Sequence, residues 1–435
     1  MLTSIRMRSR IATPSKVSLC VAVFIAVCQF APFLAQDVAR HLGWVHEPLP
    51  GDFPTFYYAA VLYRSGRNPY DLAVLANCGK IMDIQIFPFL YPPTSLPAFS
   101  PLALGAIDAS LLAFQAIGFL CLIYVLFVVI RTAEREQWPT SWRQMGLLAL
   151  ASFSAIYLTF RNGQVNIVAT AAMLFAWVRA RENLEGYEAA CAAALLITTL
   201  LKTYPVLLVL LFLIHRDFKV IAWFVLFTVA DALLSYFTVQ HGAWHSWTAD
   251  VMPTGRFGVT PFGLFPPSAV WNQSLNGALS RTLGEGTTAR IGIFLQAVVL
   301  GLTALVCWTS RRQGRRRFYD LGFGTVVVAT FLIAPLSWFH HFVFLIPALA
   351  AFASILNLTE WRDSIGWKAT LLLVTFMISA GWPQIRSDSR AALALMTLPI
   401  SGPLALFAMF IILSFAPSVA WRFVGPEDTL NTAAR

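Results

Sequence analysis

Few residues of this chain could do acid–base or anion-binding chemistry, and they stand at the borders of long apolar segments. Asp52 could take a proton as a general base, because a well-placed carboxylate can accept the proton of a hydroxyl. Lys202 and the adjacent His340 and His341 could hold an anion through charged or strongly polar N–H groups. Ionisable groups near membrane depth are costly and usually have a role. We therefore treat these four residues as candidates for one site.

Each candidate also has a structural interpretation. Asp52 precedes a helix-like run, so it could simply cap that helix, and Asp71 has the same interpretation. Lys202 could extend along apolar surface to reach the interface. His340 and His341 would point about 100° apart on a helix, so we expect at most one of them to face a shared ligand.

Amide and aromatic side chains occur in further clusters. One cluster runs from Arg161 to Asn166, another from Trp271 to Gly277, and a third from Ser337 to His341. Aromatic residues such as Tyr57 and Tyr58 more often anchor a helix at the interface than contact a substrate, although they could do both.

The composition indicates a membrane protein. The chain has 435 residues, of which 58% are hydrophobic and 12% are charged, and its mean hydropathy is +0.68. A soluble domain carries about 25% charged residues, so this chain cannot cover a water-exposed surface of its size. Ordinary cytosolic enzymes, disulfide-stabilised secreted scaffolds and disordered tails are therefore excluded.

About twelve apolar stretches could be membrane-spanning helices, each of which needs about 20 apolar residues. The first, Val17 to Ala35, follows four basic residues, and we interpret it as an uncleaved anchor. The others lie at about 109–130, 144–160, 164–180, 187–201, 205–215, 219–238, 288–310, 319–337, 341–357, 368–382 and 391–413. The pieces at 187–201 and 205–215 are short for spans.

The net charge of +10 is explained by membrane topology better than by nucleic-acid binding. Lys and Arg concentrate in cytoplasmic loops. If both termini are cytoplasmic and the spans alternate, most basic residues fall inside, including the cluster from Arg311 to Arg317. The same assignment places every polar cluster named above outside. We therefore expect a single site at the extracytoplasmic boundary of the inner (cytoplasmic) membrane.

We expect one integral membrane domain over residues 1–435, with two long extracytoplasmic loops at 36–96 and 240–289. The first loop contains a helix-like segment, Phe53 to Tyr63, and a proline-rich stretch that ends with Phe87 to Pro93, and prolines continue after it at Pro97 and Pro101. Apolar segments so interrupted by proline cannot satisfy their own backbone in lipid, so this stretch should lie in the interface or pack on protein.

The histidines and cysteines give no sign of a metal site. No CxxC pair occurs among the six cysteines, and His241 and His245 lack the glutamate of an HExxH motif. We therefore expect no metal and no cofactor.

The ordered set of clusters resembles glycosyltransferase family 87 over about residues 50–350. This family contains polyprenyl-phosphate-mannose-dependent α-(1→2)-mannosyltransferases of the GT-C superfamily. The matching pieces are Asp52-Phe53, Tyr57-Tyr58-Ala59-Ala60, Gly66-Arg67-Asn68-Pro69-Tyr70-Asp71, Tyr91-Pro92-Pro93, Pro101-Leu102, Gly163-Gln164-Val165-Asn166, Lys202-Thr203-Tyr204-Pro205, Asn272-Gln273-Ser274-Leu275 and Ser337-Trp338-Phe339-His340-His341. Family members often carry Arg where this chain has Asn276, so its acceptor could differ.

The resemblance implies an all-α GT-C fold whose first extracytoplasmic loop starts with the catalytic aspartate, here Asp52. It implies inverting transfer of a hexose, with mannose the family's best-known sugar, from a polyprenyl phosphate to a lipid or glycan acceptor. Membrane lipids would be the other partners. On this hypothesis Lys202, His340, His341 and Arg161 would bind the donor phosphate, and the sugar or acceptor would contact Tyr57, Tyr58, Gln164, Asn166, Asn272, Gln273 and Trp338.

The alternative is a transporter or flippase of lipid-linked sugars. Such proteins often have repeated halves and polar sites at the membrane midplane. This sequence shows neither clearly, and its polar clusters fall at one face. Sugar flux without any acceptor would distinguish the two functions.

Overall fold

The structure, a computed structural model, describes residues 16–42, 44, 49, 51–82, 84–151, 153–357 and 397–415. The span expected at 368–382, the start of the one expected at 391–413 and both chain ends lie outside these ranges.

Within the described ranges the regular elements are helices, apart from an isolated bridge between Asn272 and Trp338. The longer helices are α1 (Lys16–His41), α5 (Ile107–Arg135), α6 (Thr140–Ala151), α8 (Asn166–Arg181), α9 (Tyr187–Leu201), α11 (Phe218–Thr238), α14 (Glu285–Ser310), α15 (Arg315–Ile333), α16 (Leu345–Asn357) and α19 (Ser401–Phe415). The shorter helices are α2 (Phe53–Arg64), α3 (Leu72–Met82), α4 (Leu96–Phe99), α7 (Ser154–Arg161), α10 (Leu208–His215), α12 (His241–Ser246) and α13 (Leu275–Leu283). Short 3₁₀ or π segments are η1 (Pro93–Ser95), η2 (Ser100–Leu104), η3 (Tyr204–Leu207), η4 (Trp247–Val251), η5 (Met252–Thr254), η6 (Phe339–Phe344) and η8 (Leu398–Ile400).

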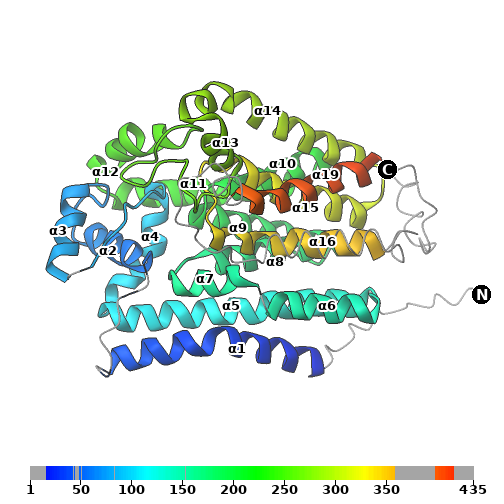
Figure 1. Cartoon of the computed structure of the whole chain (residues 1–435), viewed down its shortest axis with the longest axis horizontal. Coiled ribbons are helices and arrows are strands. Elements are labelled where there is room, and N and C mark those ends of the chain that lie inside the picture. Colours follow the sequence, from blue (N-terminus) through cyan, green and yellow to red (C-terminus); the bar gives the residue numbers. More distant parts are fainter. Residues whose placement is uncertain are drawn as a thin grey trace, which may run out of the picture.

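The long helices form a bundle, and the short helices gather at one end of it (Figure 1). α1 packs against α5, α8 against α9, and α15 against α14, α16 and α19. In Figure 1 the elements of the first long loop, α2 to α4, lie beside α12 of the second loop at the left of the bundle. The two loops that the sequence separates by more than a hundred residues therefore share one end.

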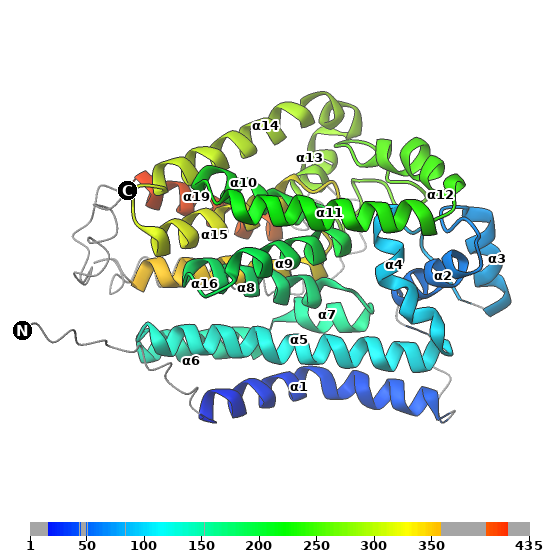
Figure 2. The same ribbon diagram turned by 180° about the vertical axis from the view of Figure 1, so that it is seen from behind.

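Among the described residues, five helical segments are long and apolar enough to cross a membrane. They are α5, α11, α14, Phe339–Asn357 and Leu398–Phe415, and a bent pair within α1 would make six. α11 lies on the face seen in Figure 2 and is mostly exposed, so its Val, Leu and Phe side chains present an apolar surface. Over the residues that the structure describes, the protein is therefore a helical membrane protein.

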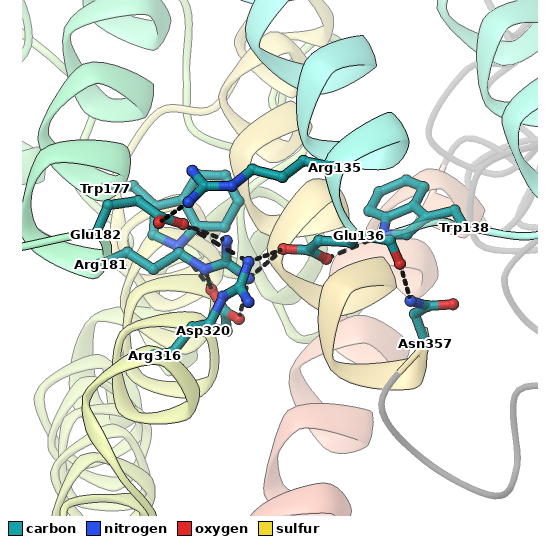
Figure 3. Close-up of polar contacts among 9 residues, drawn as sticks. All are labelled: Arg135, Glu136, Trp138, Trp177, Arg181, Glu182, Arg316, Asp320 and Asn357. Atoms are coloured by element: carbon teal, nitrogen blue, oxygen red, sulfur yellow. Dashed lines mark hydrogen bonds and ion pairs between the residues drawn. The ribbon is translucent and has the colours of Figure 1, made fainter. Parts of the chain in front are cut away.

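At the end of the bundle away from the two long loops, a buried group of ion pairs joins the helices (Figure 3). Arg181, at the end of α8, binds both carboxylate oxygens of Asp320 on α15, at 2.6 and 2.8 Å. The same guanidinium also pairs with Glu136 after α5 and with Glu182. Asn357, which ends α16, donates to the Glu136 carbonyl at 2.7 Å. Arg181 thus links α8 to α15 and to the end of α5, and Glu136 joins α16 to this group.

Two helices, α8 and α15, connect these ion pairs to the loop end of the bundle. α8 runs from Asn166 at the loop end to Arg181, and α15 runs back from Asp320 toward the loop that precedes η6. The buried ion pairs therefore fix two helices whose other ends carry polar residues of the loop end.

Candidate active site

A cavity of about 560 Å³ lies at the loop end, between the first loop, the α7–α8 turn, the residue after α9, the second loop and η6. Of the residues that the sequence proposed for a site, the cavity brings seven together. They are Asp52, Arg161, Gln164, Lys202, Trp338, His340 and His341. Stretches far apart in the chain thus converge on one concave surface, as the sequence predicted for a single site.

Asp52 occupies the N-cap position of α2, but its side chain makes no capping hydrogen bond. The sequence explains this: a capping side chain accepts from the N–H of the second or third helical residue. The second residue is Pro54, which has no N–H, and the N–H of the third, Thr55, is bonded to the Asp52 carbonyl at 3.1 Å. The carboxylate is therefore not engaged in capping, unlike that of Asp71, which accepts from two N–H groups of α3.

The cavity changes the proton affinity of Asp52. Burial raises the pKa of its carboxyl group, because the charged form loses water. A hydrogen bond from Gln164 and the nearby Lys202 act in the opposite sense and lower this pKa, but burial prevails. The carboxylate is thus more basic than an ordinary aspartate, as a proton acceptor requires.

Lys202 follows the last residue of α9 and lies outside the five candidate spans. Its Nζ atom donates to Oε1 of Gln164 at 3.4 Å and lies 3.2 Å from Nε2 of His341. The ring of Tyr91 lies beneath it, with its centre 5.2 Å from Nζ. Burial lowers the pKa of Lys202 to about 8, although Asp52 partly offsets this effect.

Hydrogen-bond partners are present for the carbonyl and the Nδ1 atom of His340 but not for its Nε2 atom. Its Nδ1 lies 3.0 Å from Nδ2 of Asn162, and its carbonyl accepts from the side chains of Thr159 and Asn166. An Asn amide nitrogen can only donate, so the imidazole proton lies on Nε2. Among the described residues this buried Nε2 has no partner. A buried, unpaired donor costs about 1–3 kcal/mol, which an acceptor oxygen of a ligand would recover.

Both histidine rings line the cavity, whereas the sequence led us to expect one at most. The turn η6, which contains both residues, forms one wall of the cavity itself. The rings meet edge to face, with centres 4.6 Å apart and planes at 85°. The indole of Trp338 lies parallel to His340 at 6.4 Å.

Three predicted sugar-binding amides lie outside the cavity lining and hold its wall. Asn166 donates to the His340 carbonyl at 3.2 Å. Asn272 donates to the carbonyl of Pro335 and accepts from the N–H of Ser337, at 3.0 Å each. The N–H of Gln273 donates to the Ser337 carbonyl, and its side chain donates to Val270. Contact of these residues with sugar stays a prediction.

Three further residues that the sequence singled out also lie outside the cavity lining. The hydroxyl of Tyr57 donates to the Gly105 carbonyl, and Tyr58 packs with Leu62 and Leu75, so neither ring lines the cavity. Asn276, where family members often carry Arg, accepts from the Gly258 N–H and donates to the Pro335 carbonyl. It too supports the loop before η6.

Sequence reasoning missed three residues of the lining: Asn162, Tyr91 and Tyr204. Each lies inside a cluster that the sequence did single out, and Asn162 directly follows Arg161, which was chosen for its charge. The signal that could have identified these three residues was their position inside such a cluster. Within the described ranges, no group of three or more His, Cys, Asp or Glu could hold a metal ion.

Comparison with known proteins decides the family. The sequence model of glycosyltransferase family 87 matches residues 89–335, which is more than half of the chain. The chain belongs to this family. It is therefore a membrane glycosyltransferase. The match begins after Asp52, so the role of that residue rests on its surroundings in the structure.

Similar proteins come from mycobacteria. A Mycobacterium tuberculosis protein named polyprenol-phosphate-mannose-dependent alpha-(1-2)-phosphatidylinositol mannoside mannosyltransferase is 25% identical, with 76% of each chain covered. The Mycolicibacterium smegmatis protein of the same name is 27% identical over 74% of this chain and 76% of its own. A phosphatidylinositol pentamannoside mannosyltransferase of M. smegmatis is 30% identical over 68% and 70%. No solved structure matches this glycosyltransferase.

Proposed function

We propose that this glycosyltransferase transfers mannose from a polyprenyl phosphate to a lipid or glycan acceptor, with inversion and with Asp52 as general base. One observation carries the proposal: the Asp52 carboxylate is free of its helix and shares a cavity with Lys202, His340 and His341. The names of the relatives support polyprenyl-phosphate mannose as donor and a phosphatidylinositol mannoside as acceptor.

The chemistry needs one carboxylate. Asp52 removes the proton of the acceptor hydroxyl as its oxygen attacks the anomeric carbon, and a positioned base contributes about 10²–10⁴ in rate. The leaving group is a phosphate, so no acid has to protonate a sugar oxygen. This differs from glycoside hydrolysis, which uses a pair of carboxyl groups.

The remaining lining residues divide between the phosphate, the sugar and the lipid. The Nε2–H of His340 and the amine of Lys202 bind phosphate oxygens, with Arg161 at the exposed rim. The flat face of Trp338 suits a sugar ring. Apolar side chains of the lining, Leu158, Leu336 and Phe339 among them, suit the start of the isoprenoid chain.

An extracytoplasmic site is supported by the distribution of charge. Arg135, Arg181 and Arg316 meet at the end of the bundle away from the cavity. Because basic residues concentrate on the cytoplasmic side, the cavity belongs to the outer side. A polyprenyl-phosphate donor would reach it from the bilayer.

The test is transfer by the purified protein in liposomes. Polyprenyl-phosphate mannose and a total lipid extract are supplied, and products are sought by mass spectrometry as a gain of one hexose. Asp52→Asn should abolish transfer and keep donor binding. Asp71→Asn is the matched control, because Asn also caps a helix, and it should retain activity.

Full activity of Asp52→Asn would remove that residue from the role of base. Mannose flux across the liposome membrane without an acceptor and without product would instead support the transporter.

A further inference from the structure

Aromatic rings from three separate segments contact one another along the cavity. The rings of Phe87 and Phe265 meet edge to face, with centres 6.2 Å apart, and Phe265 meets Trp338 in the same way, also at 6.2 Å. Trp338 in turn lies parallel to His340. All four residues line the cavity. This series of rings therefore joins the first long loop, the second long loop and η6.

The two ends of the series lie beside different functional groups. A Cβ atom at Gly51 would lie 3.9 Å from the Phe87 ring, so this ring lies next to the residue that precedes Asp52. The other end is His340, whose Nε2 atom has no partner among the described residues and binds the donor phosphate in the proposed function. The order of contacts thus leads from the general base to the phosphate site, with Phe265 between them.

Inverting transfer fixes the order of the reacting groups. The acceptor oxygen attacks the anomeric carbon from the side opposite to the leaving phosphate, so the acceptor, the transferred sugar and the phosphate lie in sequence. With the phosphate at His340, the transferred sugar lies next to Trp338. The acceptor then belongs at the Phe87 and Phe265 end of the series, where Asp52 can reach its hydroxyl.

The loops hold both rings of this end in place. The Thr55 hydroxyl donates to the Phe87 carbonyl at 2.9 Å, which fixes Phe87 to the first turn of α2. Gly263 has a φ of +64°, and a Cβ atom there would lie only 2.7 Å from Cγ of Pro88. The second loop is therefore in close contact with the first loop directly beside the two rings. Phe265 nevertheless stays 42% exposed, so its ring is open to a ligand.

An exposed aromatic ring beside a carboxylate suits a sugar better than an alkyl chain. The face of an aromatic ring is negative, and one face of a pyranose carries C–H groups that the neighbouring oxygens make slightly positive. The hydroxyl groups at the edge of the sugar stay free for Asp52 and for water. The isoprenoid chain has its own apolar lining in the bundle, at Leu158 and Leu336.

We propose that Phe87 and Phe265 form the acceptor subsite, and that this subsite binds a pyranose ring which the acceptor already carries. The ring lies against the Phe265 side chain and presents one hydroxyl to Asp52. This inference rests on the proposed function and deepens it, because it makes a sugar-bearing molecule the acceptor and excludes a lipid without sugar.

Kinetics with a simple acceptor test the subsite. Phe265→Leu removes the aromatic face and keeps an apolar side chain. With octyl α-mannoside as acceptor, the acceptor KM should rise roughly threefold to tenfold. The donor KM and kcat should stay unchanged, as for a contact that is equal in the ground state and the transition state. Phe265→Trp should keep the wild-type acceptor KM, because it restores an aromatic face.

The matched control is Phe237→Leu. Phe237 is 80% exposed at the end of α11 and does not line the cavity, so all three constants should stay at their wild-type values. An acceptor KM that Phe265→Leu leaves unchanged would overturn the proposal. A rise of the donor KM instead would show that the ring contacts the donor, and would overturn it as well.

The class of acceptor is tested with 1-octanol, which offers a hydroxyl on the same chain without a sugar. The wild type should transfer to octyl α-mannoside and not to 1-octanol. Equal use of the two acceptors would contradict the pyranose subsite.

A binding measurement separates the subsite from the transfer reaction. Methyl α-mannoside, which has no lipid chain, is added without donor to the full chain in nanodiscs, and saturation-transfer NMR is recorded. Its ring protons should receive more saturation from the wild type and from Phe237→Leu than from Phe265→Leu. Equal saturation by all three proteins would overturn the subsite even if mannosyl transfer is observed. The expected difference would support the subsite even if the donor proved to be another sugar.

Discussion

The backbone N–H of Asp52 donates to the carbonyl of Asn162 at 2.9 Å. The side chain of the same asparagine lies 3.0 Å from Nδ1 of His340. Asn162 therefore places the carboxylate of the first loop and the imidazole of η6 relative to each other, although some 290 residues separate them. The turn between α7 and α8 is the centre of the site.

Replacing Asn162 by Ala should lower kcat while leaving Asp52 in place. The Asp52 contact uses the backbone of residue 162, which the substitution keeps, whereas the side-chain donor to His340 is lost. The His340 proton would then no longer be confined to Nε2. Loss of one buried hydrogen bond of about 1–3 kcal/mol corresponds to roughly a fivefold to hundredfold loss of rate.

The matched control is Asn68→Ala. Asn68 also joins two loops, through a 2.9 Å bond to Ser246, but it does not line the cavity. It should lower thermal stability without changing kcat. A wild-type kcat in Asn162→Ala would contradict the positioning role of that side chain.

Much of the architecture followed from composition. An all-helical membrane protein, the helical segment after Asp52 and the convergence of distant polar clusters were all predictable, because apolar length and charge bias act locally along the chain. A helix at Phe53–Arg64 matches the segment expected from Phe53 to Tyr63. The count of about twelve helices stays a prediction, since residues 358–396 lie outside the described ranges.

What the sequence could not give was the use of each side chain inside a cluster. Asn166 and Asn272 were candidates for sugar hydroxyls, yet their amides hold backbone carbonyls of residues 335 and 340. Any exposed-looking amide can serve either purpose, and only the path of the neighbouring backbone decides. Asp52 was the opposite case: Pro54 removes one of the two N–H groups that it could cap, but only the structure shows that the other, on Thr55, is bonded to the Asp52 carbonyl.

Gln164→Leu should move the acid limb of the pH–rate profile to higher pH. The hydrogen bond from Gln164 lowers the pKa of Asp52, so its loss raises that pKa further. Activity requires the ionised base and is lost as the pH falls through the Asp52 pKa. The loss should therefore begin at a higher pH in the variant, measured as kcat/KM against pH.

Gln240→Leu, at an exposed glutamine of the second loop, serves as the control and should leave this limb in place. An acid limb that stays fixed or moves to lower pH in Gln164→Leu would exclude Asp52 as the group responsible.

Arg181→Met should strongly destabilise the fold, and Arg316→Met should not. The Arg181 side chain is 4% exposed and pairs with Asp320, Glu136 and Glu182. Its removal would leave buried carboxylates without this charged partner, which costs about 3–5 kcal/mol. Arg316 contacts Glu136 and Glu182 as well, but its side chain is 43% exposed, and such pairs contribute about 0–1 kcal/mol. Thermal unfolding in detergent measures both, and equal effects would contradict the ranking.

Gly277→Ala should impair both folding and transfer. A Cβ atom at residue 277 would lie 2.2 Å from the carbonyl oxygen of Asn272 and 2.8 Å from its Cγ, so Asn272 would have to move. That asparagine holds Pro335 and Ser337, which precede His340. Overpacking of this kind costs about 1–3 kcal/mol, and the displaced wall should lower kcat in addition to the melting temperature.

Gly286→Ala provides the comparison, because a Cβ atom there meets nothing within 4 Å and the residue lies in the first turn of α14. It should be neutral or stabilise the protein by about 0.5–1 kcal/mol, since Ala loses less backbone entropy than Gly. If Gly277→Ala behaved like Gly286→Ala in both melting temperature and kcat, the Asn272 contact would not support the site.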